Sequence, residues 1–385
     1  MMGVVGPYQY VWSSIREPLA RHVGIETAAL STVFTLFVIF QAGSQFPVGW
    51  WRDRHGPRAI SVIAAILAGG GYIGLAYARS VWQVYLLYST GAIGVGIVYT
   101  VAVNTALKWF PDRRGLTSGI GTMAFAGGSA ALVPYVRLNT GPELPPDAYV
   151  GVLRNIGLLI AVVILVGAWV LRDPPEDWSS SQDADREGGP NRTHTWQEML
   201  RTWQFWLMYA MFVAVSGAGL MLTEKVIGYA DHLGLAAMIA TASATLLPLA
   251  GGAGRLILGE VSDRVDRKKA MAISFSLLGI GLFAVVWVGL QGAGTAFVVA
   301  VIFATFFWSP QYTLFPSIIG DYYGEKHSSA NYALLYSGKM WGGIFGGSFT
   351  GVLVGSLGWT PTFLLAGAIA LAAGVAALLL RPPGA

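Results

Sequence analysis

Long apolar stretches alternate with short polar segments along most of the chain. Each of these stretches reaches the ~20 residues that an α-helix needs to cross the hydrocarbon core of a bilayer. We therefore predict membrane-spanning helices over Ala28–Trp51, Ala59–Ala78, Trp82–Phe110, Leu116–Val136, Tyr149–Leu171, Trp203–Ala230, Ala236–Leu258, Ala270–Leu290, Ala293–Ile319, Asn331–Leu357 and Thr360–Leu380.

The N-terminal run Met1–Ile15 is apolar and aromatic, but it is shorter than a span and ends at Arg16-Glu17-Pro18. It has neither the basic start nor the small-residue cleavage site of a signal peptide. We interpret it as the outer part of a first spanning helix whose inner part is missing. With it, the pattern predicts twelve helices, six on each side of a central polar segment.

That polar segment, Arg172–Thr202, contains Asp-Pro-Pro, three serines and alternating charges. We expect a solvated linker with a short surface helix near Trp196–Arg201. The chain then divides into an N-terminal six-helix bundle (1–171), the linker (172–202) and a C-terminal six-helix bundle (203–385). The predicted fold is an all-α integral membrane protein made of two bundles.

Composition agrees, since only 11% of residues are charged and 54% are hydrophobic, whereas soluble domains carry about 25% charged residues. The chain has no cysteine, and its five histidines are scattered through the predicted loops. No nucleophile–base pair, metal cluster or phosphate-binding loop is apparent. We expect no enzyme activity, no cofactor, no metal and no nucleic-acid partner, and a monomer surrounded by lipid.

Lysine and arginine are distributed unequally between the two sides of the predicted bundle. The side with fewer of them carries Arg16, Arg21, Arg79, Arg137 and Arg154. The linker's side carries Arg52, Arg54, Arg58, Lys108, Arg113, Arg114, Arg172, Arg186, Arg192, Arg201, Arg264, Arg267, Lys268, Lys269, Lys326 and Arg381. Because positive loops stay inside, we expect a multi-pass protein of the cell membrane with its linker and C-terminus in the cytoplasm.

The two halves repeat one loop. Gly49-Trp-Trp-Arg-Asp53-Arg54 follows the second predicted helix, and Gly259-Glu-Val-Ser-Asp263-Arg264 follows the eighth. A parallel repeat of two bundles places a substrate site near the membrane midplane, between the halves. We expect Asp53, Arg54, Asp263 and Arg264 to cap helix ends and form ion pairs that hold one conformation closed, which is a gating role.

Two cations lie inside predicted spans, Arg255 and Lys339. A cation at the centre of a spanning helix costs ~2.5–3.5 kcal/mol on insertion scales, and neither stretch offers a carboxylate. Their counter-ions could arrive with an anionic substrate; the alternative is pairing with backbone carbonyls or a distant acid. Aligning the repeats puts neutral Gln45 and Ala124 at the equivalent positions of the first half.

One carboxylate, Glu224, lies inside a predicted span, next to Lys225 and near the outer end of the seventh helix. Adjacent residues do not share a helix face, so we expect Glu224 to point inward and Lys225 to extend toward the surface. An interfacial or gating role for Glu224 is favoured over proton carriage.

The repeated G-x-x-x-D-R loop and the six-plus-six topology resemble the major facilitator superfamily. Within it the chain resembles the oxalate/formate antiporter branch, which is related to monocarboxylate transporters. The stretches that carry this resemblance are Gln9-Tyr10-Val-Trp12, Gln41-Ala-Gly-Ser-Gln45, Gly94-Val-Gly-Ile-Val-Tyr99, Asn104-Thr, Trp109-Phe-Pro-Asp-Arg-Arg-Gly115, Glu198-Met-Leu-Arg-Thr-Trp-Gln-Phe-Trp206, Leu314-Phe-Pro-Ser317, Asn331-Tyr332 and Lys339.

The resemblance implies that Arg255 and Lys339 are the charged substrate ligands. It also implies aromatic cavity positions at Tyr10, Tyr99, Trp308 and Tyr312. Two positions depart from the antiporter, which has Tyr on helix five where this chain has Phe125, and Trp on helix eleven where it has Tyr336. Tyr336 precedes Lys339 by three residues and so shares its helix face. Gln41 and Gln45 share a face in the same way, as helix contacts or as ligands.

Two fixed positive charges favour a small anion, and a dianion could neutralise both; the resemblance implies that this anion is a carboxylate. Because moving two uncompensated cations through the membrane is costly, we expect the loaded carrier to reorient more easily than the unloaded one. Anion exchange of an oxalate-like dicarboxylate for a monocarboxylate follows. The alternatives are a proton-linked or facilitated carrier of a lactate-like monocarboxylate, which would use Glu224, and a membrane receptor built on a transporter scaffold.

Overall fold

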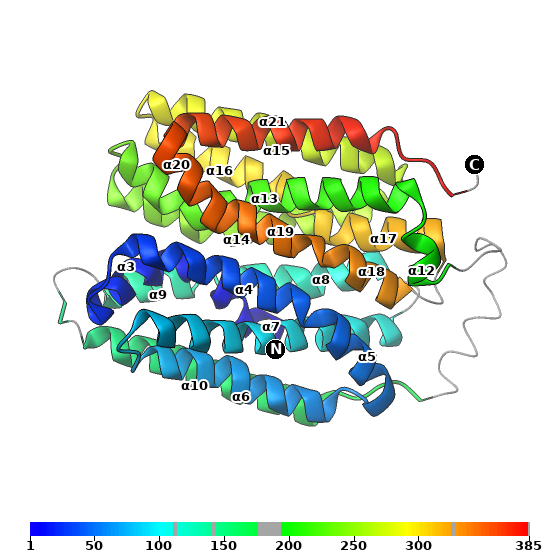
Figure 1. Cartoon of the computed structure of the whole chain (residues 1–385), viewed down its shortest axis with the longest axis horizontal. Helices are drawn as coiled ribbons and strands as arrows, with labels where there is room; N and C mark the ends of the chain where they lie inside the picture. Colours follow the sequence, from blue (N-terminus) through cyan, green and yellow to red (C-terminus); the bar gives the residue numbers. More distant parts are fainter. Residues whose placement is uncertain (111–113, 141–143, 146, 176–193, 325–327, 384–385) are drawn as a thin grey trace.

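The computed structural model describes residues 1–110, 114–140, 144–145, 147–175, 194–324 and 328–383, and the regular secondary structure of this part of the chain is all helix, with no strand. Its helices lie in two layers, one from each half of the sequence, with the N-terminal half below and the C-terminal half above in Figure 1. Eleven helical segments of the described residues are long and apolar enough to cross a membrane.

The N-terminal half is built from helices that run back and forth between the two ends of the bundle. They are α1 (Met2–Val5), α2 (Pro7–Tyr10), α3 (Trp12–Val23), the 3-10 turn η1 (Thr27–Leu30), α4 (Ser31–Gly43), α5 (Gln45–His55), α6 (Arg58–Leu75), α7 (Val81–Trp109), α8 (Arg114–Gly127), α9 (Leu132–Asn139) and α10 (Ala148–Val170).

The C-terminal half follows the same pattern, with breaks in its tenth and eleventh helices. Its elements are α13 (Trp203–His232), α14 (Ala237–Ser262), α15 (Arg267–Leu290), α16 (Gly294–Trp308), α17 (Gln311–Tyr323), α18 (Ser328–Tyr336), α19 (Gly338–Ile344), the π-helical segment η3 (Phe345–Phe349), α20 (Thr350–Leu357) and α21 (Trp359–Ala377).

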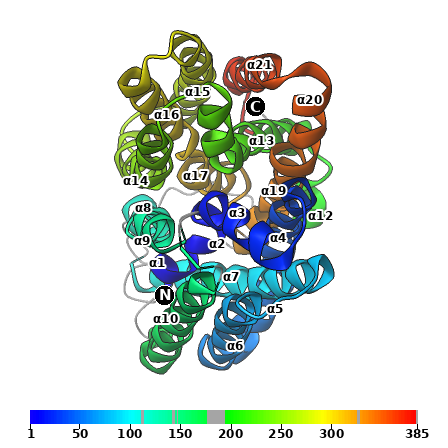
Figure 2. The ribbon, with the colours of Figure 1, turned by 90° about the vertical axis from the view of Figure 1, so that its left-hand side faces the viewer.

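The first helix extends further than the sequence predicted. We expected it to end at Arg16, yet α3 continues through Arg16 and Pro18 to Val23, where Gly24 with φ 75° closes it. Pro18 lies inside α3, and the chain before it is divided into short helices at Gly6 and at Val11. Of the three pieces, α1 lies within the N-terminal half, whereas α2 and α3 also contact α13 of the C-terminal half (Figure 2).

The linker's described end is fixed to the C-terminal half. The short helix α12 (Trp196–Met199) confirms the predicted surface helix. Thr195 and Glu198 cap it reciprocally: the Glu198 carboxylate accepts the Thr195 backbone N–H at 2.7 Å, which lowers the pKa of Glu198. The backbone N–H of His194 donates to the carbonyl of Tyr323 at 2.8 Å, so the chain enters α13 in a set position.

The halves meet closely where helix eleven carries pairs of glycines. Gly343 and Gly347 face α4, where an added Cβ would overlap Val38 and Thr35. Thr35 Oγ1 also donates to the Gly343 carbonyl at 3.3 Å and accepts the Ser348 backbone N–H at 2.9 Å. Small residues therefore let the two bundles approach to backbone contact.

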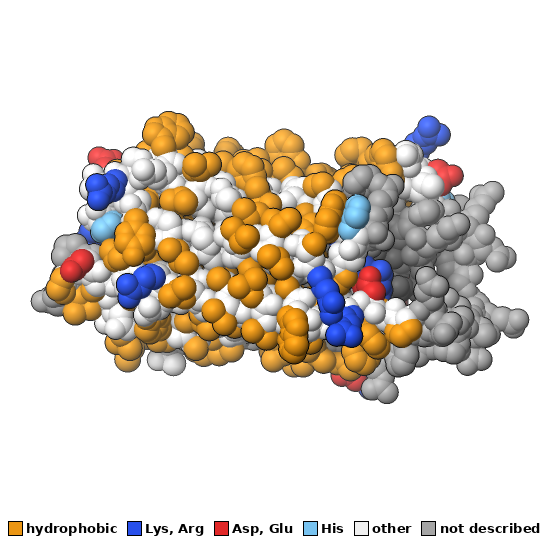
Figure 3. Space-filling view, turned by 90° about the horizontal axis from the view of Figure 1, so that it is seen from below, with side chains coloured by type: hydrophobic (Ala, Val, Ile, Leu, Met, Phe, Trp, Pro, Cys, Tyr) orange, Lys and Arg blue, Asp and Glu red, His pale blue; other side chains and the backbone are white. Residues whose placement is uncertain are grey.

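The outer surface has the pattern of a membrane protein. Hydrophobic side chains form a broad belt across the middle of the face in Figure 3, and charged side chains gather at its two ends. We call the end that carries the linker and α12 the linker side, and the opposite end the far side.

Candidate substrate-binding site

Arg255 lies in α14 with its side chain only 1% exposed, and it points across the molecule into the N-terminal half. Its Nη1 donates to the Thr122 carbonyl at 2.7 Å, and its Nη2 to the Tyr10 hydroxyl at 3.0 Å. Its Nε donates to Ser309 Oγ at 2.7 Å. All three nitrogens of the guanidinium are therefore held by neutral oxygens, two of them from the opposite half.

Two local features of the sequence bring Ser309 to this position. Helix ten breaks after Trp308 because Pro310 has no backbone N–H to donate, so α16 ends and α17 restarts at Gln311. Gly251 and Gly254 on α14 lie against this break, where a Cβ on Gly254 would overlap the Phe306 carbonyl. The close approach places Ser309 beside Arg255.

Lys339 lies in α19 and is likewise 1% exposed. Its Nζ donates to Gln9 Oε1 and to Gln41 Oε1, each at 3.0 Å, and to the Tyr336 hydroxyl at 3.3 Å. Both glutamines belong to the N-terminal half. Among the described residues no carboxylate forms an ion pair with Lys339 or Arg255, so both charges are solvated by dipoles rather than neutralised.

One aromatic ring joins the two cations. The Tyr312 ring centroid lies 4.7 Å from Arg255 Cζ and 5.4 Å from Lys339 Nζ. A cation near an aromatic face gains ~0.5–2 kcal/mol, most when water is excluded. The Tyr312 hydroxyl is buried without a hydrogen-bond partner among the described residues, so it has a free donor beside both charges.

The other aromatic positions predicted for the site surround this group. Phe125 packs edge-on against Tyr10 and Tyr99, with ring centroids 5.9 Å and 5.6 Å apart, and Tyr99 lies 5.7 Å from Tyr336. Trp308 meets Tyr312 at 5.8 Å. The structure thus gathers every aromatic side chain that the sequence predicted for the site into one buried cluster.

Gln45, at the position of the first half that aligns with Arg255, is 5% exposed, and its Nε2 has no hydrogen-bond partner among the described residues. Its neighbour Gln41 accepts a hydrogen bond from Lys339 Nζ, whereas no described hydrogen bond joins Gln45 directly to either cation. Of the two amides that share this face, Gln41 is therefore the one bound to a charged group.

Sequence reasoning left three neutral partners of the cations without a role. Gln9 was noted only as part of a resembling stretch, while Ser309 and the Thr122 carbonyl were not singled out. A signal existed for Gln9, because an amide is uncommon in an apolar span. No sequence signal marks the Thr122 carbonyl, since every residue has one and only the fold directs it.

On the far side, a second charged group joins the two halves. Arg16 Nη1 in α3 lies 2.8 Å from Glu224 Oε1 in α13, and Lys225 Nζ lies 2.6 Å from Glu224 Oε2. The Glu224 side chain is fully buried and Lys225 is 5% exposed. The expectation that Lys225 extends to the surface was wrong, because Lys225 folds back onto the carboxylate of its neighbour.

On the linker side, the two repeated loops differ. The side chains of Asp53 and Arg54 lie outside the described residues. Beside them, Arg52 is fully buried, and its Nη2 contacts Asp173 Oδ1 at 2.6 Å, while Lys108 Nζ reaches Asp173 Oδ2 at 3.3 Å. These two ion pairs tie the end of α10 to α5 and α7 within the N-terminal half.

In the second loop, Asp263 accepts from Arg267 at 3.3 Å, and Arg267 Nε also lies 3.1 Å from Asp321 Oδ2 at the end of α17. Arg264 pairs instead with Glu260, one turn earlier on its own helix, at 2.6 Å. All of these partners belong to the C-terminal half. The described ion pairs of this loop therefore brace one bundle and do not bridge the two.

A multi-pass bundle pair with buried cations between its halves defines a membrane transporter. The chain belongs to the Major Facilitator Superfamily, whose profile matches residues 4–316 and 225–385. The fold agrees: the proton:xylose symporter XylE, solved with 6-bromo-6-deoxy-D-glucose, matches with a TM-score of 0.72 at 15% identity, over 97% of this chain and 92% of that one. The family and fold are those of transporters, not enzymes.

Two curated relatives match almost the whole chain. The oxalate:formate antiporter of Oxalobacter formigenes is 33% identical over 371 residues, which cover 95% of this chain and 85% of the antiporter. An uncharacterized 38 kDa protein of Thermoproteus tenax is 30% identical over 378 residues, 95% of this chain and 89% of that protein. The MFS-type transporter YhjX of Escherichia coli is 25% identical over 86% of this chain.

Proposed function

We propose that this protein exchanges small carboxylates across the membrane by alternating access, with Arg255 and Lys339 as the charged ligands of the substrate. The observation that carries the proposal is that both cations are buried between the halves with only neutral partners among the described residues. The similarity to an oxalate:formate antiporter supports the same substrate class.

Arg255 and Lys339 suit complementary parts of such a substrate. The planar guanidinium can present two parallel N–H groups to one carboxylate, and the ammonium supplies a compact charge for a second. The hydroxyls of Tyr10 and Tyr336 already accept hydrogen bonds from these groups, and each hydroxyl keeps its own proton to donate to a bound carboxylate. Tyr99, Phe125 and Trp308 form the apolar walls that exclude water.

The fixed charges also favour exchange over one-way movement. Without a bound anion, two cations must pass through the closed conformation with dipoles as their only solvation, whereas a dicarboxylate neutralises both. A barrier difference of only ~1.4 kcal/mol between these cases would slow the unloaded carrier about tenfold. The loaded carrier therefore reorients faster, and uptake becomes linked to release of another anion.

Counterflow in proteoliposomes tests the function. Vesicles loaded with radiolabelled oxalate should lose it at least about tenfold faster when oxalate or formate is present outside. Arg255→Gln and Lys339→Gln should each abolish this exchange, while Arg79→Gln, which removes a far-side surface charge, should leave it intact. Equal efflux with and without external anion would exclude exchange, and full uptake by either site variant would exclude the site.

A proton-linked carrier of monocarboxylates is the second candidate, because Glu224 is a buried carboxylate inside a spanning helix. Both of its oxygens lie within ion-pair distance of a cation, which favours a fixed charge over a proton carrier. Lactate uptake driven by a pH step into vesicles without internal substrate, and lost in Glu224→Gln, would select this candidate.

We place the linker and C-terminus in the cytoplasm, on the strength of the lysine and arginine bias. The chain has no cysteine, so single cysteines can report this directly. A membrane-impermeant maleimide should label Arg79→Cys in intact cells and leave Lys269→Cys unlabelled until the membrane is permeabilised. The reverse pattern would invert the orientation.

A further inference from the structure

A pocket of about 390 Å³ lies on the linker side of the N-terminal half, between the α5–α6 turn and the end of α10. It is lined by residues 55–58 and 171–173. It is an open depression of the surface rather than an enclosed cavity. It involves no residue of the buried cation cluster, and the transport mechanism assigns it no role.

The walls of the pocket are held together by hydrogen bonds from the Arg58 side chain to backbone carbonyls. Gly56 with φ 75° turns the chain sharply between α5 and α6, so that Arg58 begins the next helix beside the end of α10. Arg58 Nε donates to the Leu171 carbonyl at 3.2 Å, and its Nη2 to the Trp169 carbonyl at 3.3 Å. These bonds fix Arg58 at the rim of the pocket, and its Nη1 can still donate a hydrogen bond to a ligand.

The pocket is electropositive although an acid lines it. Both oxygens of Asp173 are occupied, Oδ1 by Arg52 and Oδ2 by Lys108, so this acid is already neutralised by two cations. Arg58 and Arg172 are exposed, and neither forms an ion pair with a described carboxylate. Among the described residues, the unbalanced charge at the pocket is therefore positive, and guanidinium groups are suited to phosphate oxygens.

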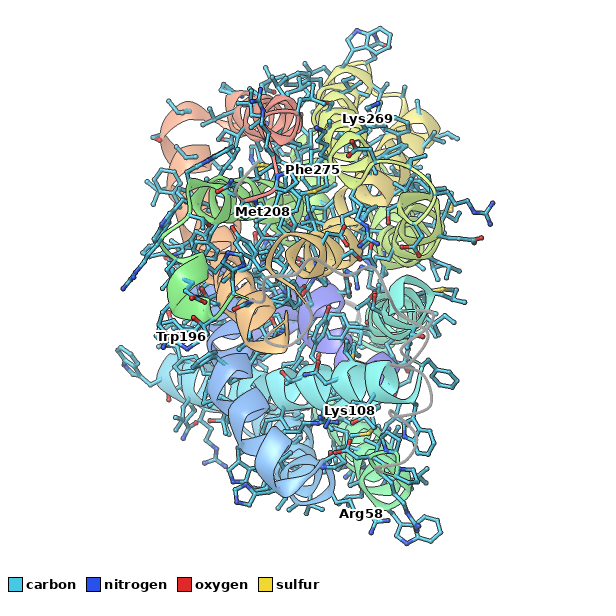
Figure 4. The ribbon with its side chains drawn as sticks, turned by 90° about the vertical axis from the view of Figure 1, so that its right-hand side faces the viewer. Arg58, Lys108, Trp196, Met208, Lys269 and Phe275 are labelled. Atoms are coloured by element: carbon cyan, nitrogen blue, oxygen red, sulfur yellow. The ribbon has the colours of Figure 1, made fainter. Side chains whose placement is uncertain are left out.

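The location fits the level of lipid headgroups. Figure 4 shows Arg58 at the outer margin of the N-terminal half and Lys108 further in. Trp169, one turn of α10 from the pocket, is 80% exposed on the lipid-facing surface, and tryptophan gathers at the membrane–water interface. Basic pockets on the cytoplasmic side of spanning helices are suited to anionic lipid headgroups.

We propose that this pocket binds a phosphate group, carried by the headgroup of an anionic phospholipid, with Arg58 and Arg172 as its charged ligands. The ion pairs of Arg52 and Lys108 with Asp173, which lines the pocket, keep this acid from repelling the ligand. A lipid held there would brace the end of α10 against the α5–α6 turn, on the perimeter of the bundle and away from the substrate.

Native mass spectrometry of the delipidated, full-length protein tests the site. The protein is titrated with dioleoyl-phosphatidylglycerol, with dioleoyl-phosphatidylcholine and with inorganic phosphate. We expect phosphatidylglycerol to fill one site with higher affinity than phosphatidylcholine, and the double variant Arg58→Gln/Arg172→Gln to weaken it about tenfold or more. Arg58→Lys/Arg172→Lys, which keeps the charge, should retain most of the binding.

The matched control is Arg79→Gln/Arg154→Gln, which removes two exposed arginines from the far side. It should leave phosphatidylglycerol binding unchanged. Inorganic phosphate that occupies the same variant-sensitive site and displaces the lipid would identify free phosphate as a ligand of the pocket. Equal phosphatidylglycerol binding by wild type and the Arg58/Arg172 variant, or an equal loss in the control, would overturn the proposal.

Discussion

Arg16 and Glu224 join the two halves of the transporter on the far side, with Arg16 Nη1 2.8 Å from Glu224 Oε1. The carboxylate is fully buried and the arginine is 18% exposed. Lys225 completes the group from the same helix as Glu224. Because Arg16 belongs to α3 and Glu224 to α13, any movement that separates the bundles on this side must first break the pair.

Glu224→Gln should therefore favour opening on the far side. The change leaves two largely buried cations without their carboxylate, at a cost of about 1–3 kcal/mol in the closed conformation. Spin labels at Tyr77→Cys and Leu290→Cys, exposed far-side positions in opposite halves, should show a longer mean distance by pulsed electron resonance.

Glu260→Gln is the matched control for that experiment. Glu260 forms an ion pair with Arg264, and both side chains are exposed. Loss of this ion pair should therefore lower the stability by only ~0.3–0.5 kcal/mol. The distribution of distances between the two spin labels in Glu260→Gln should match that of the wild type. An unchanged distribution in Glu224→Gln would show that this ion pair does not hold the halves together.

Arg255→Lys should impair carboxylate exchange although it keeps the charge. A lysine ammonium is a point donor and cannot reach Ser309, the Thr122 carbonyl and Tyr10 in the directions that the guanidinium does. With charged hydrogen bonds worth ~1.5–3 kcal/mol each, the loss of one predicts about a tenfold to hundredfold rise in the substrate concentration for half-maximal exchange. If Arg255→Lys exchanged substrate at the wild-type affinity, the result would contradict a role for the planar guanidinium of Arg255.

The spans and the buried cations could be predicted because each depends on a property of its own segment. Apolar length marks a spanning helix, and a charge inside one is conspicuous at any position, as with Arg255 and Lys339. Gln9 is different: its contact with Lys339 depends on where Gly6 and Val11 interrupt the first helix. The pattern of apolar residues there shows no such interruptions.

The far-side ion pairs show the same limit. Glu224 was evident as an acid within a span, but Arg16 was assigned to the end of a helix that in the structure continues past it. Adjacent residues such as Glu224 and Lys225 start on different faces of a helix. The lysine side chain is long enough, however, to bend back to the carboxylate of its neighbour. Burial in a region without water makes that contact more favourable than extension.

Under the proposed exchange mechanism, Gln41→Glu should let the carrier also reorient without a bound substrate. The new carboxylate would occupy the place of the amide oxygen that lies 3.0 Å from Lys339 Nζ, and would act as a built-in counter-ion. Substrate then competes with a fixed anion, so exchange should fall, while efflux without external anion should rise. Proteoliposome efflux with and without external oxalate measures both, and Gln83→Glu, an exposed far-side change, serves as control.

Gly343→Val should hold the halves apart where helix eleven meets α4. Even a Cβ at this position would overlap Val38, and the branched side chain adds two methyl groups in a contact that has no space. Overpacking of this kind costs typically 1–3 kcal/mol, here in the conformation in which the bundles touch. We expect a lower thermal midpoint and the same longer Tyr77–Leu290 distance as in Glu224→Gln. Gly351→Val, on the same helix with open space around it, should change neither the thermal midpoint nor the distance. Equal effects of the two variants would show that valine itself destabilises helix eleven, rather than loss of the contact between Gly343 and α4.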